Sequence, residues 1–164
     1  MSTPAESMAI PLPDAVQVRD LLGLLFDGLT VKPAAKLDLS PKSGGYYALY
    51  VTDAGAPAAI CGCDLAFAAN GGAALSMLPP NVAKDAAKAK ALTDVMEANL
   101  REVMNICTRL MLQDGSPHLR LDQVYAAGAA PAAAAAIAGA AKRRADFEIG
   151  LGKYGSGMLS VLAG

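Results

Sequence analysis

The 164-residue sequence contains no tryptophan and a single histidine, His118. Aromatic residues make up 5% of the chain, which leaves few rings for stacking on nucleic-acid bases or for anchoring at a membrane surface. A zinc site is not expected, because one histidine and three unclustered cysteines do not supply the usual set of spaced ligands. We therefore expect neither a metal nor a cofactor to be held by this chain.

Positive charge is also scarce. Fourteen Lys and Arg residues face fifteen Asp and Glu residues, for a net charge of -1 at pH 7. No basic stripe is present that could neutralise a phosphate backbone, so nucleic acid is not an expected partner.

Signals for a membrane or for export are missing as well. Residues 1–13 lack a basic stretch followed by an apolar core, and their three prolines predict a flexible tail. The uncharged run 124–141 consists mostly of alanine, so we interpret it as an Ala-rich helix and not as a membrane span. Cys61, Cys63 and Cys107 fall at apolar positions, as reduced thiols of a cytoplasmic protein do.

The remaining residues, 14–164, are expected to form a single domain in which helices and strand pairs interleave. Apolar periodicity predicts helices over 14–28, 65–78, 82–112 and 131–142, with the third being one helix or two joined near Leu92. Strands are predicted over 30–39, 46–52, 57–63, 119–125, 144–151 and 157–162. This order predicts an α+β sandwich, a mostly antiparallel sheet with long helices packed on it.

Local signals refine these elements. Asp14, Asp64 and Asn81 stand where N-caps are expected, and Pro33 favours an edge strand. The pair Gly71–Gly72 would weaken its helix, so we interpret it as a point where another backbone packs closely.

The segment 99–112 is strongly amphipathic and carries the candidate chemistry. At 100° per residue one face collects the apolar residues Leu92, Met96, Leu100, Val103, Cys107, Leu110 and Met111. Glu102, Asn105 and Arg109 lie along the polar side, three and then four residues apart, and are predicted to form one exposed strip.

A carboxylate and a carboxamide spaced by three residues can act together. The amide of Asn105 has a donor and an acceptor with which to orient a water molecule, and the carboxylate of Glu102 can pair with a lysine of a partner. The same spacing is also common on helix faces that simply contact solvent.

The motif Glu102-Val-Met-Asn105 and the order of elements around it resemble the CheC, CheX and FliY group of chemotaxis phosphatases, most closely the CheX type. The resemblance covers the chain from Asp14 onward and implies a CheC-like fold. It implies removal of phosphate from the phospho-aspartate of a response-regulator receiver domain such as CheY. In that reaction Glu102 would pair with the receiver's lysine and Asn105 would position the attacking water. Magnesium would be held by the receiver, and the chain would form a homodimer.

Two features differ from the family pattern. The motif occurs once, as in the CheX type, and Arg109 stands where the family has a small residue. An arginine there could fold back onto Glu102, fill the space that the receiver enters, or contact phosphate. Three hypotheses follow: a receiver phosphatase, a non-catalytic binding module of the same fold, or a protein whose helix strip is a dimer surface.

Two further motifs have simpler interpretations. Gly150–Gly157 matches a glycine-rich phosphate loop but lacks a following helix, so we interpret it as a hairpin turn. Ser116, His118 and Asp122 could suggest a hydrolytic triad, but the sequence around the serine is not that of a nucleophile elbow.

Overall fold

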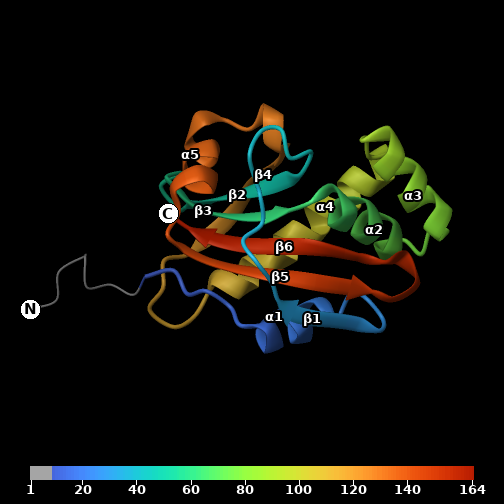
Figure 1. The fold of residues 1–164 in the computed structure, drawn as a ribbon. Helices are drawn as coiled ribbons and strands as arrows, with labels where there is room; N and C mark the ends of the chain where they lie inside the picture. Colours follow the sequence, from blue (N-terminus) through green and yellow to red (C-terminus); the bar gives the residue numbers. More distant parts are fainter. Residues whose placement is uncertain (1–8) are drawn as a thin grey trace, which may run out of the picture.

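The computed structural model describes residues 9–164, which form one six-stranded sheet with helices on both faces (Figure 1). The strands are β1 (Leu29–Pro33), β2 (Tyr46–Thr52), β3 (Pro57–Cys63), β4 (Leu119–Ala126), β5 (Arg143–Leu151) and β6 (Ser156–Ala163). The α-helices are α1 (Ala15–Leu22), α2 (Leu65–Leu75), α3 (Pro80–Ala89), α4 (Asp94–Ile106) and α5 (Ala132–Ala140). Short 3-10 helices are η2 (Cys107–Met111), η3 (Ala127–Ala129) and η4 (Gly152–Tyr154).

The strand order is β1-β5-β6-β3-β2-β4, and every pairing between these strands is antiparallel. The hairpins β2–β3 and β5–β6 lie in the centre, and β1 and β4 form the two edges. This confirms the predicted α+β sandwich, and it confirms the edge position that Pro33 indicated for its strand.

The two faces of the sheet support separate cores. Along β2, Ala48 and Tyr50 point into the larger core beneath α1, α2, α3 and α4, whereas Tyr47, Leu49 and Val51 point into a smaller core beneath α5. This alternation is the period of two that a strand imposes on its side chains. Both faces of the central strands are therefore apolar.

The structure shortens several predicted elements, among them the helix over 65–78, which ends at Leu75. The first helix ends at Leu22 and not at Gly28, because the chain turns at Gly23, whose N–H bonds to the carbonyl of Arg19. The strand predicted over 30–39 ends at Pro33, and the N–H of Ala34 makes one more backbone bond to β5, to the carbonyl of Asp146 at 3.0 Å. The segment 82–112, predicted as one helix or as two joined near Leu92, contains two α-helices, because Lys90 adopts a left-handed conformation that ends α3.

The capping predictions have mixed outcomes. Asp14 and Asp64 are N-caps, each accepting a hydrogen bond from the backbone N–H three residues on, 2.8 Å in both cases. Asn81 is not a cap, because Pro79 holds that position and Pro80 begins the helix. Proline at the first helical position has no N–H that would need an intrahelical acceptor, so the helix starts earlier than predicted.

The alanine-rich run 124–141 is not one helix. It contains the end of β4, the 3-10 turn η3 and the short helix α5. No helix within residues 9–164 combines the length and apolar character needed to cross a membrane.

The predicted N-terminal tail lies partly outside the described residues. Of residues 1–13, residues 9–13 are described, and within them Ile10 is buried against the larger core. The guanidinium of Arg143 donates to the carbonyl of Ile10 at 2.8 Å. The packed domain therefore starts a few residues before Asp14.

A buried ion pair on β5 connects β5 and β6 to the long segment between β1 and β2. The carboxylate of Asp146 accepts from Arg144 at 2.7 Å, from the backbone N–H of Leu37 at 3.0 Å and from Ser160 at 2.5 Å. The Asp146 side chain is 9% exposed. Burial alone would raise its pKa, but the hydrogen bonds from Arg144, Leu37 and Ser160 together lower the pKa below its usual value.

We predict that Asp146→Asn lowers the free energy of unfolding by about 2 kcal/mol at pH 7, the usual scale for hydrogen bonds to a charged group. A lowered folded-state pKa adds stability above the unfolded value of about 3.9, and that stability disappears as the pH falls through the folded value. The difference between wild type and variant in urea unfolding should therefore shrink below about pH 4.

The matched control is Asp27→Asn, at an exposed aspartate with no hydrogen bond given by the structure. It should change the unfolding free energy by less than about 0.5 kcal/mol. If the difference in unfolding free energy between wild type and Asp146→Asn stayed constant from pH 7 to pH 3, the lowered pKa of Asp146 would be contradicted.

Candidate functional site

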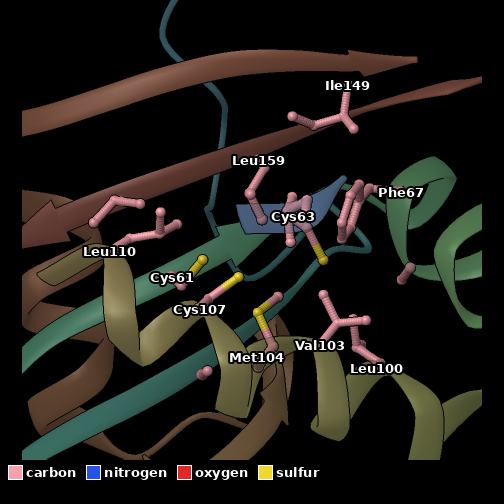
Figure 2. Close-up of a cluster of buried hydrophobic side chains, with 14 of the residues drawn as sticks. Cys61, Cys63, Phe67, Leu100, Val103, Met104, Cys107, Leu110, Ile149 and Leu159 are labelled. Atoms are coloured by element: carbon pink, nitrogen blue, oxygen red, sulfur yellow. The ribbon is translucent and has the colours of Figure 1, made fainter. Parts of the chain in front are cut away.

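The candidate site is built on α4, whose position is set first by its buried side. Thr93 caps the helix by accepting from the N–H of Met96 at 3.3 Å. All seven residues predicted to form the apolar face are buried, and Met104 joins them. Figure 2 shows Leu100, Val103 and Met104 of α4 pointing into the same cluster as Phe67, Ile149 and Leu159.

Gly72 brings α2 and α4 into close contact. A Cβ added at Gly72 would lie 3.0 Å from both the Cβ and the carbonyl oxygen of Met96. Asn99 completes the contact, because its amide donates to the carbonyl of Gly72 at 2.8 Å and to Ser76 at 2.7 Å. The close approach predicted from Gly71–Gly72 is therefore confirmed, and it holds the first half of α4.

Tyr50 holds the second half. Its phenol donates to the carbonyl of Met104 at 2.5 Å, in the last turn of α4, where carbonyls lack intrahelical partners. Burial is the largest of the influences that raise the pKa of Tyr50 well above its usual value, so the phenol stays protonated and can donate. This contact lies one residue before Asn105.

The three cysteines lie beneath this part of the helix, in the cluster shown in Figure 2. All three are free and buried. The hydrogen bond between the thiols of Cys61 and Cys107, followed by burial, raises the pKa of Cys61, and burial raises that of Cys63. Protonated buried thiols serve as packing groups, which agrees with their interpretation from the sequence.

Glu102 and Asn105 are both exposed on α4, one turn apart on the same side. Within residues 9–164 the structure gives neither side chain a hydrogen bond or an ion pair, so both are free to contact a partner. Arg109 is exposed too, but it belongs to η2 and not to α4.

The change from α-helix to 3-10 helix separates Arg109 from the predicted strip. A 3-10 helix advances by about 120° per residue and an α-helix by about 100°, so Arg109 lies about 100° around the axis from Asn105 instead of about 40°. The described residues contain no ion pair between Arg109 and Glu102. The strip predicted over Glu102, Asn105 and Arg109 therefore crosses a change of helix type before its last member.

Two grooves flank this region. The first, which we call the β4 groove, has a volume of about 670 Å³ between α4 and the edge strand β4, and its charged lining is Asp94, Glu97, Arg101 and Asp122. The second, the α1 groove, has a volume of about 430 Å³ and is lined by Pro11, Leu12, Gln17, Asp20, Leu21, Leu24, Arg109, Leu110, Leu112 and Gln113. Neither Glu102 nor Asn105 lines either groove. In the sequence both come after Arg101, which lines the β4 groove, and before Arg109, which lines the α1 groove.

The other sequence motifs have structural roles. His118 pairs with Asp53 at 2.7 Å, a contact that the sequence did not suggest, while Ser116 donates to the carbonyl of Gln113. Ser116, His118 and Asp122 therefore form no triad. Gly150–Gly157 spans the β5–β6 turn, as interpreted from the sequence. No group of three or more His, Cys, Asp or Glu among residues 9–164 is arranged to hold a metal.

Comparison with solved structures finds the same fold in chemotaxis and flagellar proteins. The chain matches CheX in the CheX–CheY–BeF3–Mg²⁺ complex from Borrelia burgdorferi over 92% of this chain and 97% of that chain, with a TM-score of 0.56 and 11% identity. It matches FliM in the FliM–SpeE complex from H. pylori over 91% of this chain and 78% of that chain, with a TM-score of 0.52 and 11% identity. At these identities the likeness establishes the CheC/CheX/FliM fold, which confirms the fold that the resemblance implied.

The sequence comparisons give no further assignment. No protein-family model matches the chain, and no curated protein matches it.

Removing the Tyr50 hydroxyl tests how much its hydrogen bond to the Met104 carbonyl stabilises the end of α4. We predict that Tyr50→Phe lowers the free energy of unfolding by about 1–3 kcal/mol, because the buried carbonyl of Met104 loses its partner. The matched control is Tyr47→Phe, a buried tyrosine whose hydroxyl has no hydrogen bond given by the structure. Equal midpoints for the two variants in urea unfolding would show that the Tyr50 contact adds nothing.

Proposed function

We propose that this chain is a CheX-like phosphatase that removes phosphate from the phospho-aspartate of a receiver domain. The observation that carries the proposal is the placement of Glu102 and Asn105. Both side chains are exposed one turn apart on a helix that is buried along its other side, and neither has a hydrogen bond or an ion pair with another of residues 9–164. The matching CheX was solved with CheY, which makes a receiver domain the partner to test first.

The proposed reaction uses position and charge and needs no covalent intermediate on this chain. The carboxylate of Glu102 pairs with a lysine of the receiver and fixes how the two proteins meet. The amide of Asn105 then holds a water molecule in line with the phosphorus atom through its donor and its acceptor. The water attacks the phosphorus, the bond from phosphorus to the aspartyl oxygen breaks, and phosphate leaves. Magnesium is expected on the receiver.

Rigidity of the helix matters for this chemistry. An exposed amide can orient water only if its backbone holds still, and α4 is fixed at one end by Gly72 and Asn99 and at the other by Tyr50. Positioning errors of about 1 Å can cost about a hundredfold in rate, so these buried contacts serve the proposed activity.

A second candidate is a non-catalytic binding module. The match to FliM supports it, because the fold is shared by a protein solved in complex with SpeE. This candidate predicts a stable complex with a receiver and no acceleration of phosphate loss. Homodimer formation and a cytoplasmic location, both implied at the outset, remain predictions, and sedimentation of the purified chain would measure the first.

We predict that the wild-type chain accelerates phosphate loss from a receiver domain of the same genome, and that Asn105→Ala lowers that rate about a hundredfold. Loss of ³²P from the phosphorylated receiver measures both rates. Asn81→Ala, which removes an exposed amide from α3, is the matched control and should retain the wild-type rate. If no receiver of the set loses phosphate faster with wild type, the phosphatase proposal is wrong.

A further inference from the structure

We propose that the α1 groove, with Arg109 at its side, binds the polypeptide surface of the receiver beside its phosphorylation site and does not bind the phosphoryl group. The inference rests on the proposed function and deepens it by assigning part of the docking surface. The occupant has a stated chemistry: a carboxylate flanked by apolar side chains.

Several apolar side chains that line the α1 groove are exposed or half-buried. Leu24 is 75% exposed and Leu112 is 36% exposed, while Leu21 and Leu12 are half-buried beside them. Single exposed leucines are common, but here several line one concave surface between α1 and η2. Covering them would remove apolar area from water, which favours association.

The lining of the groove carries one cation, Arg109, and one carboxylate, Asp20. Arg109 is exposed, and the structure gives it no ion pair or hydrogen bond among residues 9–164. The groove contains one carboxylate, Asp20, which pairs with Arg19 at 3.2 Å. An unpaired guanidinium next to apolar surface matches a partner carboxylate, because the planar fork can bind both oxygens.

The groove begins one turn along the chain from the proposed catalytic residues, at Arg109. From Asn105 to Arg109 the chain rises by about 7.5 Å, counting one α-helical and three 3-10 steps. A stable interface covers about 800 Å² on each partner, equivalent to a disc of about 16 Å radius. A receiver centred on Asn105 would therefore extend over Arg109 and into the α1 groove.

The helix change directs Arg109 away from the reacting centre. Because of the 3-10 steps, Arg109 is rotated by about 100° around the helix axis from Asn105. Arg109 lines the α1 groove, and neither Glu102 nor Asn105 does. Arg109 should thus contribute to affinity for the receiver whether or not the receiver is phosphorylated. A phosphoryl contact would instead act in the chemical step.

The test compares binding with turnover in three variants of the full chain. Arg109→Glu reverses the free charge, Leu24→Ser removes exposed apolar surface, and Lys42→Glu reverses an exposed charge on the segment between β1 and β2 as the control. Calorimetry gives the Kd for the receiver with Mg²⁺ alone and with beryllofluoride and Mg²⁺. Phosphate loss at saturating receiver gives the maximal rate, and circular dichroism checks folding.

We expect Arg109→Glu to raise Kd about tenfold and Leu24→Ser about fivefold, for both receiver forms, with an unchanged maximal rate. Lys42→Glu should match wild type. An unchanged Kd in Arg109→Glu, or a lowered maximal rate with unchanged Kd, would overturn the proposal, the second by assigning Arg109 to the phosphoryl group.

The same data separate this proposal from the proposed function. If wild type binds the receiver but does not release phosphate, the phosphatase proposal fails alone, and the Kd values of the variants still decide the groove. If wild type binds no receiver form, both proposals fail.

Discussion

The contact between α2 and α4 at Gly72 is the constraint on which the candidate site depends. With no side chain at that position, the backbone of α4 approaches α2 closely enough for Asn99 to hydrogen-bond the Gly72 carbonyl. A larger residue would meet Met96, whose backbone cannot move without displacing the helix. Because α4 lies between α2 and the edge strand β4, this single close approach also sets how the polar side of α4 faces outward.

The far end of α4 is held by a different kind of interaction. Tyr50 reaches from the sheet and donates to the Met104 carbonyl, while Cys61 and Cys107 pack against each other below it. Immediately afterwards the helix tightens into η2. The tightening leaves Asn105 on the face that Glu102 shares, and it rotates Arg109 toward α1. One local change in helix type thus separates the proposed water-positioning group from the arginine.

The fold is shared with CheX and with FliM, and their solved complexes contain different partners. The scaffold is therefore compatible with more than one role, and a function has to be argued from particular side chains. In this chain the argument depends on two exposed residues, on the groove beside Arg109 and on the contacts that keep α4 in place.

Much of the fold follows from patterns that are local in the sequence. The hairpins β2–β3 and β5–β6, the caps Asp14 and Asp64, and the buried side of α4 all arise from alternation, turn residues or helical periodicity. These signals act over a few residues, so the sequence by itself determined them, together with the i, i+3 spacing of Glu102 and Asn105.

Other features depend on contacts between distant segments. The pairing of β3 with β6, the bond from Tyr50 to Met104 and the hydrogen bond between His118 and Asp53 join residues far apart in the chain. The helix type at Cys107–Met111 belongs to this group, because the apolar periodicity predicted an α-helix as far as Leu112 and the structure has a 3-10 helix there. Sequence patterns report which residues share a face of an element. Only tertiary packing decides where an element ends, how its last turn winds and what its exposed residues face.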